Sequence, residues 1–350
     1  MHTSVIIPTH NREHILGRTL GYYASQAKAG GNFELIIVDD GSEDGTHRLF
    51  EGLSKIDLHT AGHHAHRHRD IIRIARKGWY SPEATQNPSI PFSDVYVRYI
   101  KIEKSGRSIA RNVGIGFSAY PLIIFADDDI FVESEFIRKH IEAHTPDDLL
   151  VVMGMVIHTG DLEDPFSARW KLKDINTAFL ATGNASILKK YLLEAGLFDE
   201  WYRVYGWEDF DLGIHLKDLG LRSEKRKVYG YHYDPSQKSS GHREPMNPRL
   251  IYDKERERGL SAVYFYTNHP LPWVRRFTLV ENRPLKMIVN LLGRRNWFLK
   301  RKKLRSCAGL LKLLVRYKGY FDGVEEGRAH FEKGEGQCTP RHMTKVSRGM

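Results

Sequence analysis

Three consecutive aspartates follow a short apolar run and give the strongest chemical signal in the sequence. Asp127, Asp128 and Asp129 stand in the segment 125–131, where apolar residues flank them on both sides. Carboxylates so close together repel one another, and a bound cation relieves that repulsion. Their oxygens suit Mg²⁺ or Mn²⁺, which proteins commonly hold with one or two carboxylates and the phosphates of a substrate. A cap for the helix expected near Glu133 would need one aspartate rather than three, so we expect a metal site.

Two further polar clusters follow apolar runs nearer the start of the chain. Thr9 and Arg12 follow the first run, and Asp39 and Asp40 open the sequence Asp-Asp-Gly-Ser after the second. A carboxylate at the end of a strand can accept hydrogen bonds from a nucleobase N–H or a ribose hydroxyl. Asp, Gly and Ser also favour ordinary turns. The presence of the aspartate triad in the same chain favours the ligand interpretation.

Arg107 and Arg111 lie one turn apart near the start of a predicted helix. Arginine binds phosphate in a fixed fork geometry, so this pair is consistent with a phosphate-bearing ligand. Solvated arginines on the helix surface are the alternative.

Acidic residues also begin a later helix. Glu208 and Asp209 precede leucines at 212, 216 and 219, which form one face of that helix. The helix dipole alone favours acidic residues in a first turn. Aromatic residues at 201, 202, 205 and 207 stand just ahead, however, and aromatic faces beside a carboxylate make a platform for a sugar or another amphipathic acceptor. The carboxylate can then serve as a general base.

The elements that must position these residues alternate between strand-like and helix-like segments. The predicted strands are Ser4–Ile7, Phe33–Val38, Val95–Ile102 and Leu122–Phe125, with helical spacing in the segments between them. This alternation predicts an α/β fold with a mostly parallel sheet. In such sheets ligands bind beyond the carboxyl ends of the strands, where the polar clusters fall.

Six motifs, in this order, resemble the family 2 glycosyltransferases of the GT-A fold. They are Ser4-Val-Ile-Ile-Pro-Thr-His-Asn-Arg12, Ile37-Val-Asp-Asp-Gly-Ser42, Ile109-Ala-Arg-Asn-Val-Gly114, Asp127-Asp-Asp129, Thr182-Gly-Asn184 and Trp207-Glu-Asp209. The resemblance covers residues 3 to about 235 and implies a Rossmann-like GT-A sheet with helices on both faces. It also implies an inverting, metal-dependent enzyme that uses a nucleoside-diphosphate sugar.

The resemblance implies roles for particular residues. The expected nucleotide-sugar contacts are Thr9, Arg12, Asp39, Asp40, Asp127, Asp128 and either Arg107 or Arg111. The expected ligands of Mn²⁺ or Mg²⁺ are Asp127, Asp129 and His232, although a histidine on a strand is more often a packing residue. Asp209 is expected to be the catalytic base and Glu208 its neighbour that positions the acceptor. Trp207, Gly183 and Asn184 are expected to contact the acceptor.

The length and composition agree with a globular enzyme. The 350 residues are 41% apolar and 27% charged, which excludes a wholly disordered, collagen-like or multi-span membrane chain. With two cysteines and a strand-like run almost at the initiator Met, we expect a cytoplasmic protein without a signal peptide. We expect a GT-A domain at 1–235 with a His/Arg-rich insert at 57–94. A helical basic region at 236–335 and a flexible tail at 336–350 complete the expected organisation.

The positive charge belongs to one segment. The whole chain carries +10, but residues 275–318 hold fourteen Lys and Arg and one acidic residue, a local +13 that leaves −3 for the rest. Aromatic and leucine residues interleave with these cations, as in helices that lie on anionic membranes. We therefore expect peripheral contact with the inner face of a membrane, with a solvated lid or a nucleic-acid surface as alternatives.

The function predicted from the sequence is transfer of a hexosyl or N-acetylhexosaminyl group, with a UDP-sugar as the expected donor. The expected acceptor is a glycan or a lipid-linked precursor in cell-surface polysaccharide synthesis. The alternative is a sugar nucleotidyltransferase. An enzyme of that class is expected to have a glycine-rich loop after the first strand, and residues 8–12 lack one. A nucleic-acid-binding protein would leave the aspartate triad unexplained, so no nucleic-acid partner is expected.

Overall fold

The structure is a computed structural model that describes residues 1–26, 33–50, 56–57, 96–235, 247–294, 296, 298 and 308–332. The chain forms two compact units. Unit 1 comprises residues 1–203 and 208–244, and unit 2 comprises residues 204–207 and 245–350. The expected insert lies outside the described residues except for Asp57. The expected division at 235 and 335 stays a prediction.

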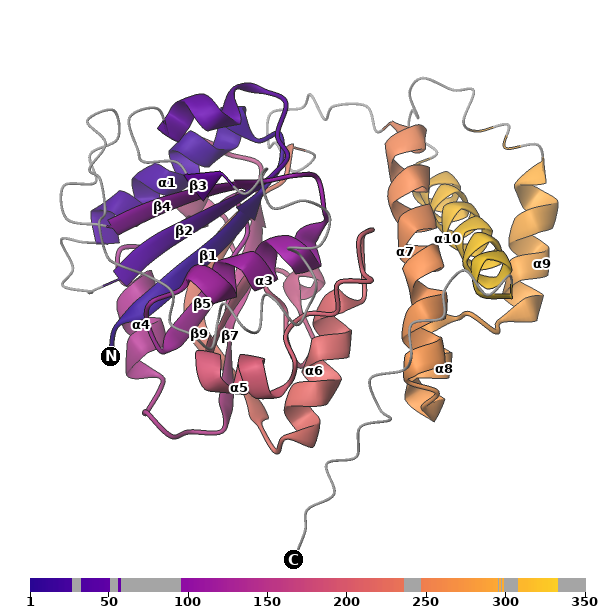
Figure 1. The fold of residues 1–350 in the computed structure, drawn as a ribbon. Helices are drawn as coiled ribbons and strands as arrows, with labels where there is room; N and C mark the ends of the chain where they lie inside the picture. The colour runs from indigo at the N-terminus through magenta and orange to yellow at the C-terminus, as the bar shows by residue number, and fades with distance from the viewer. Residues whose placement is uncertain are drawn as a thin grey trace, which may run out of the picture. The chain divides into compact units, whose positions relative to one another are not determined.

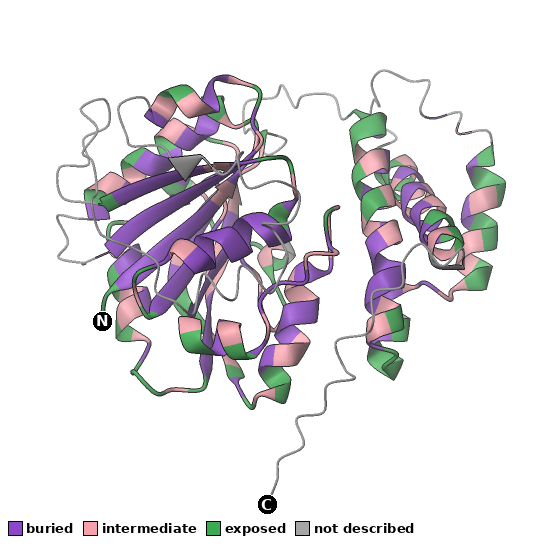
Figure 2. Ribbon diagram, viewed as in Figure 1, coloured by how far each residue is buried: buried purple, intermediate pink, exposed green. Residues whose placement is uncertain are grey.

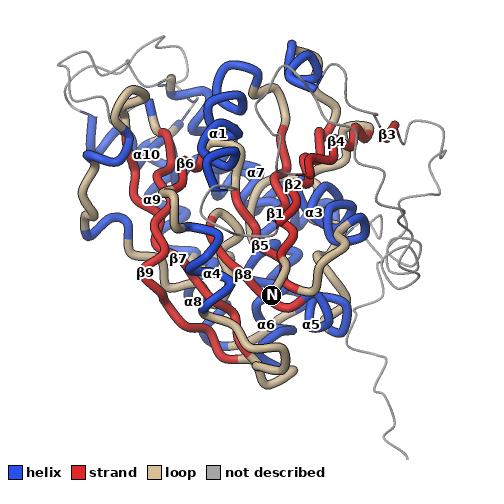
Figure 3. Tube along the Cα trace, turned by 90° about the vertical axis from the view of Figure 1, so that its left-hand side faces the viewer, coloured by secondary structure: helices blue, strands red, loops and turns tan. Residues whose placement is uncertain are grey.

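Among the described residues, a mixed sheet of nine strands forms the centre of unit 1 (Figures 1 and 3). Its strands are β1 (Thr3–Thr9), β2 (Phe33–Asp40), β3 (Ile56–Asp57), β4 (Tyr96–Ile102), β5 (Leu122–Ala126), β6 (Ile130–Val132), β7 (Leu150–Thr159), β8 (Asn184–Leu188) and β9 (Arg222–Tyr233). Their order across the sheet is β3-β4-β2-β1-β5-β8-β7-β9-β6. The half from β3 to β5 is parallel, whereas β8 runs antiparallel to both of its neighbours. β9 pairs parallel with β7 and antiparallel with β6.

Helices cover both faces of this sheet. Those of unit 1 are α1 (Glu13–Gln26), η2 (Gly45–Phe50), α3 (Arg107–Phe117), α4 (Phe136–Glu142), η3 (Pro165–Ser167), η4 (Leu172–Asp174), α5 (Lys189–Glu194) and α6 (Glu208–Asp218). One apolar cluster joins α3, α5 and α6 to the sheet, and a second joins α1 and α4 to its other face. The central strands are therefore buried on both sides, as Figure 2 shows, which explains their continuous apolar runs.

The structure confirms the predicted fold class and the strands at the expected places. The aspartate triad lies in the short connection between β5 and β6, at the carboxyl end of β5. The segment after β2 differs from the prediction, because the described part forms a single 3₁₀ helix, η2, where we expected an α-helix.

Unit 2 is helical, as predicted for the C-terminal region. It contains α7 (Pro248–Asn268), α8 (Pro272–Thr278), α9 (Arg283–Leu292) and α10 (Ala308–Glu332). Glycines allow α7 and α10 to pack closely: a Cβ on Gly259 would lie 1.9 Å from the carbonyl oxygen of Tyr320, and one on Gly323 would lie 1.9 Å from that of Arg256. Within the described ranges, none of the helices combines the length and the apolar character needed to cross a membrane.

Candidate active site

The aspartate triad is tied to the end of β1. The Thr9 hydroxyl donates to Asp128 Oδ2 at 2.7 Å. The guanidinium of Arg12 lies 3.6 Å from Asp128 Oδ1 and 3.4 Å from Asp129 Oδ2. Asp127 is the most open of the three, with 42% of its side chain exposed. The structure thus brings together five of the residues predicted for the nucleotide sugar and metal.

Crowding and burial shift the ionisation of this cluster. Burial raises the pKa of Asp128 to about 7; the negative charge of Asp129 adds to the shift, and Arg12 opposes it. Burial also raises the pKa of Asp129, and the neighbouring His232 and Arg12 oppose this shift. Carboxylates held this way have a strong electrostatic preference for a nearby cation.

His232 provides an imidazole beside the triad. It lies in β9, and its Nε2 atom is 3.4 Å from Asp129 Oδ1. Its Nδ1 atom is buried and has no hydrogen-bond partner among the described residues. Carboxylate oxygens with one imidazole nitrogen form a donor set that fits Mn²⁺ or Mg²⁺. The chemistry of these donors therefore suits the metal that the sequence predicts, while the ligand assignment itself stays a prediction.

Arg111 connects the triad to the predicted catalytic acids. Only 4% of its side chain is exposed. Its guanidinium lies 3.2 Å from Glu208 Oε1, 3.6 Å from Asp209 Oδ1 and 3.7 Å from Asp127 Oδ1. It also lies 5.4 Å from the centre of the Phe198 ring. A buried cation needs compensating charge, which these carboxylates supply. Arg111 therefore organises acidic groups.

Arg107 is exposed at the first position of α3. It directly follows a loop, residues 104–106, that is bonded to Asp40. The carboxylate of Asp40 accepts hydrogen bonds from the backbone N–H groups of Ser105, at 2.6 Å, and Gly106, at 3.0 Å, and from the Lys104 ammonium at 2.9 Å. Gly106 has φ +100, which strongly favours glycine. The positive charge of Arg107 lowers the pKa of Asp129, against the burial that raises it. Asp40, predicted to contact the nucleotide, holds the loop that carries Arg107.

Asp39 is fully buried at the end of β2. Its Oδ1 accepts from the Ser42 backbone N–H at 2.8 Å, and its Oδ2 accepts from the Tyr99 hydroxyl. These bonds fix the carboxylate at the strand end where a nucleobase contact was expected. That contact stays a prediction.

Thr182 orients the predicted base. Its backbone N–H and its hydroxyl both donate to Asp209 Oδ2 at 3.0 Å. Burial raises the pKa of Asp209 to about 6, with Arg111 opposing the shift and Glu208 adding to it. A carboxylate with a pKa of about 6 is largely ionised at neutral pH, as a general base must be.

Gly183 and Asn184, predicted to contact the acceptor, occupy different surroundings. A Cβ on Gly183 would lie 3.1 Å from Asp127 Oδ2, so glycine leaves room for that carboxylate. Asn184 is buried, and its Nδ2 donates to the carbonyl oxygens of Met155 at 3.2 Å and Val228 at 2.9 Å. The structure therefore gives Asn184 a role in holding strands together.

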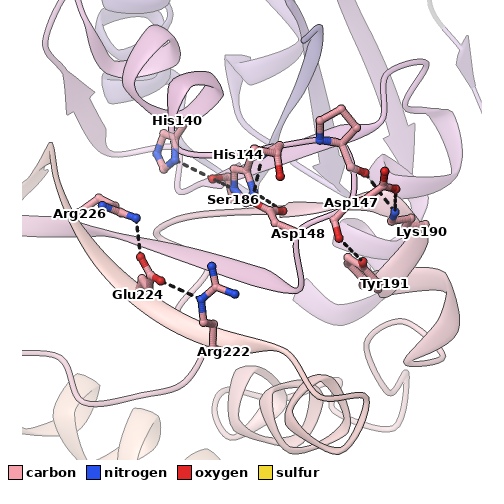
Figure 4. A network of polar contacts seen from close by, with 12 residues as sticks. His140, His144, Asp147, Asp148, Ser186, Lys190, Tyr191, Arg222, Glu224 and Arg226 are labelled. Atoms are coloured by element: carbon pink, nitrogen blue, oxygen red, sulfur yellow. Dashed lines mark hydrogen bonds and ion pairs between the residues drawn. The ribbon is translucent and has the colours of Figure 1, made fainter.

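The Asn184 side chain also contacts His140. His140, Ser186 and His144 form a buried network of polar contacts (Figure 4). Because its amide nitrogen donates elsewhere, Asn184 Oδ1 accepts from Nε2–H of His140 at 3.0 Å. The other ring nitrogen of His140 lies 2.8 Å from the Ser186 hydroxyl, which is 2.9 Å from His144 Nε2. Burial lowers the pKa of His140 to about 3, so this ring is neutral.

Trp207 belongs to unit 2. It is 8% exposed, its indole N–H donates to the carbonyl oxygen of Arg258 at 2.8 Å, and its ring stacks on Phe265 with the centroids 5.3 Å apart. The ring is a packing element of that unit, and its predicted contact with the acceptor stays a prediction.

The contacts of two supporting residues could not be predicted from the sequence. Thr182 stands in a recognised motif, but nothing in its spacing joins it to Asp209, 27 positions later. Tyr99 meets Asp39 because β4 pairs with β2 across a long insertion, which spacing cannot predict.

Comparison with known proteins finds similarity to glycosyltransferases. The family model described as "Glycosyl transferase family 2" matches residues 4–76 and 81–195. Glycosyltransferase YfnE of Bacillus subtilis (strain 168) is 25% identical over 358 residues, which cover 83% of this chain and 82% of that protein. Validoxylamine A glucosyltransferase of Streptomyces hygroscopicus subsp. limoneus is 28% identical over 62% of this chain and 48% of its own length.

More distant matches include larger proteins. Hyaluronan synthase of Pasteurella multocida is 23% identical over 73% of this chain, which spans only 27% of that protein. Among solved structures, S. aureus TarS 1–349 in complex with UDP-GlcNAc has a TM-score of 0.47 and 16% identity, covering 95% of this chain and 92% of that one.

Proposed function

We propose a function for this chain, which belongs to glycosyl transferase family 2. The proposed reaction moves a hexosyl or N-acetylhexosaminyl group from a nucleoside-diphosphate sugar, a UDP-sugar in the first instance. The acceptor is a hydroxyl of a glycan or a lipid-linked molecule, and the configuration at the anomeric carbon is inverted. The chain is a glycosyltransferase (EC 2.4), which removes the nucleotidyltransferase alternative. The choice of sugar, acceptor and stereochemistry is the proposal. Synthesis of a surface polysaccharide is the setting we propose for it.

The observation that carries the proposal is the position of Arg111 between two acidic groups. Its guanidinium lies within 3.7 Å of Asp127 on one side and of Asp209 on the other. One buried side chain therefore brings the group assigned to the donor next to the group assigned to the acceptor. Single displacement needs this proximity, because the incoming hydroxyl must reach the anomeric carbon as the diphosphate leaves.

Asp127, Asp129 and His232 would hold the divalent cation. When bound, such a cation stabilises the charge that develops on the departing diphosphate. Arg107, exposed at the start of α3, would contact the same phosphates. Asp39 and Thr9 would fix the nucleoside at the ends of β2 and β1.

Asp209 would take the proton of the acceptor hydroxyl. Thr182 holds its carboxylate, and Arg111 stabilises the ionised form. As the hydroxyl loses its proton to Asp209, its oxygen attacks the anomeric carbon on the face opposite the diphosphate, which inverts the configuration there. Glu208, paired with Arg111 at 3.2 Å, keeps the arginine in place between the two sites.

The test is the Asp209→Asn variant, with Asp218→Asn as the matched control at the exposed end of the same helix. We expect Asp209→Asn to lose about a thousandfold or more in kcat while keeping its nucleotide affinity, because the amide cannot accept the proton. The control should behave as wild type. Turnover of Asp209→Asn within a few-fold of wild type would remove Asp209 as the base.

We also propose an anionic membrane surface as a partner of unit 2. The apolar side of α9 faces outward: Met287, Ile288 and Leu291 are 73%, 56% and 67% exposed, whereas Val289 is buried. Exposed apolar side chains continue on α8 and α10, where Trp273 is 45% and Leu310 is 84% exposed.

The positive charge of the same region indicates that the partner surface is anionic. Residues 275–318 carry a net +13. Cations beside an apolar helix face complement an anionic lipid surface, at about 1 kcal/mol per cation near the surface. Contact of this kind would bring a transferase to a lipid-linked acceptor without a spanning helix.

A further inference from the structure

A second histidine, His158, lies beside His232 and is hydrogen-bonded to a buried carboxylate. His158 Nδ1 is 2.7 Å from Asp174 Oδ1. The side chain of Asp174 is only 1% exposed, whereas that of His158 is 34% exposed. A buried aspartate thus fixes the orientation of an imidazole that solvent and ligands can reach.

The sheet places this imidazole next to His232, a predicted ligand of the metal. β7 and β9 pair in parallel, with His158 directly opposite His232. The two rings are 5.1 Å apart between centroids, at an interplanar angle of 68°. His232 in turn lies 3.4 Å from Asp129. His158 is therefore the neighbour, on the adjacent strand, of a predicted metal ligand.

The hydrogen bond to Asp174 determines which nitrogen of His158 is available. Because the carboxylate accepts from Nδ1–H, the lone pair of the neutral ring is on Nε2. Histidines that bind metals through one nitrogen commonly donate the other N–H to a carboxylate or a carbonyl, which fixes the tautomer and raises the basicity of the ligand. The pair of His158 and Asp174 has this arrangement.

We propose that His158 is a second imidazole ligand, through Nε2, of the divalent cation held at Asp127, Asp129 and His232. The proposal rests on the proposed function, since it extends the same site. It makes Asp174 a positioning residue, which acts through the ring that it orients. Two imidazoles would shift the preference of the site from Mg²⁺ toward Mn²⁺, because nitrogen ligands suit transition metals better.

A purely structural role makes a different prediction. Asp174 Oδ2 also accepts from the Lys171 backbone N–H at 2.8 Å, so the carboxylate could simply hold η4 against β7. Asparagine at position 158 can place an amide N–H near the position of Nδ1 and keep the bond to Asp174, but it offers nothing at Nε2. Glutamine can place an amide oxygen near the position of Nε2 instead. His158→Asn therefore separates the two roles.

The first measurement is Mn²⁺ affinity of the full chain in the presence of UDP, from the EPR signal of free Mn²⁺. We expect His158→Asn and His158→Ala to weaken binding by about tenfold or more, with unchanged thermal stability for His158→Asn. His158→Gln should recover part of the affinity, and Asp174→Asn should lose about tenfold. His2→Gln, an exposed histidine before β1, is the control and should bind as wild type.

The second measurement detects the nitrogen ligand itself. In the His232→Ala variant with saturating Mn²⁺, electron spin echo modulation should still show a coordinated imidazole nitrogen, and the double variant with His158→Asn should lose it. Absence of that signal in His232→Ala would overturn the proposal. So would His158→Asn that binds Mn²⁺ as tightly as wild type.

The outcomes of these experiments test the ligand role of His158 and the proposed function separately. If wild-type protein binds Mn²⁺ with UDP and the His158 variants match it, the ligand role of His158 is wrong and the proposed function stands. If wild-type protein binds neither Mn²⁺ nor any nucleotide, the proposed function fails and the role of His158 fails with it. If His158→Asn weakens UDP binding equally with and without Mn²⁺, the imidazole contacts the nucleotide, and the metal-ligand role is overturned.

Discussion

Arg111 illustrates how far residue types could predict the site. The sequence indicated two arginines near a helix start and a phosphate ligand, without deciding between them. In the structure Arg111 is buried among Glu208, Asp209 and Asp127, while Arg107 is exposed. The residue types and the strand ends were predictable because each follows from local sequence. The partners were not, since contacts between residues 97 or 98 positions apart depend on how α3 and α6 pack.

The pKa of Asp209 predicts a pH dependence of catalysis. Burial raises it to about 6, so the carboxylate gains a proton as the pH falls through that value and can no longer act as a base. At saturating Mn²⁺ and donor, kcat should be level above pH about 7 and should fall about tenfold per pH unit below about 6. Turnover measured between pH about 4.5 and 8, with activity regained on return to neutral pH, checks this. A level profile down to pH about 4.5 would contradict it.

Asn184 carries a prediction that separates packing from acceptor binding. Its side chain bonds the carbonyl oxygens of Met155 and Val228 and the ring of His140. Asn184→Ala leaves these buried groups unpaired, so we expect the free energy of unfolding to fall by about 3 kcal/mol while the KM for acceptor stays the same. Urea unfolding and steady-state kinetics measure the two, with exposed Asn176→Ala as the control. An unchanged stability with a raised acceptor KM would show that Asn184 binds the acceptor.

At the scale of elements, the alternation of strands and helices was predictable and the order of strands was not. Continuous apolar runs identify β1, β2 and β5, because parallel strands covered on both faces have no polar side. The position of β8 between β5 and β7, antiparallel to both, follows from pairings that no local pattern encodes. It is this arrangement that brings Thr182, just before β8, to Asp209 at the start of α6.

Because α3 packs closely on β1, a single added carbon at Gly114 is expected to lower the stability of the fold. A Cβ on Gly114 would lie 2.4 Å from Cγ2 of buried Ile6. Gly114→Ala should therefore lower the free energy of unfolding by about 1–3 kcal/mol, because helix or strand must move. Gly21→Ala in α1 is the control: no atom lies within 4 Å of its added Cβ, and we expect a gain of up to about 1 kcal/mol. Urea unfolding that finds Gly114→Ala as stable as wild type would contradict the close packing.

Across the whole molecule, the chain combines unit 1, which carries the aspartate triad, with a helical unit that contains the basic segment. The sequence predicted the basic segment from its charge and its interleaved apolar residues. It could not predict that α9 would direct Met287, Ile288 and Leu291 outward, because the pattern of an amphipathic helix does not say which face is covered.

Membrane contact is tested by flotation with vesicles. Wild-type protein should float with vesicles that contain phosphatidylserine at low salt, and less as salt rises, because screening weakens the attraction. Replacing Met287, Ile288 and Leu291 with serine should abolish flotation and leave the thermal stability unchanged, since these side chains are exposed. Leu250→Ser, at another exposed leucine in unit 2, is the control. Failure of the wild type to float at low salt would remove the proposal, as would a change from dimer to monomer in the triple variant without any effect on vesicles.

Thermal stability measured with UDP, GDP, dTDP and CDP, each with and without Mn²⁺, tests whether the aspartate triad forms a metal-dependent nucleotide-sugar site. A ligand at about a hundred times its dissociation constant adds about 2.7 kcal/mol, which shifts the Tm by several degrees. We predict a shift with UDP that requires Mn²⁺ and that Asp129→Asn loses. A folded protein whose Tm does not respond to any nucleotide, with or without Mn²⁺, would rule out a nucleotide-sugar site at the aspartate triad.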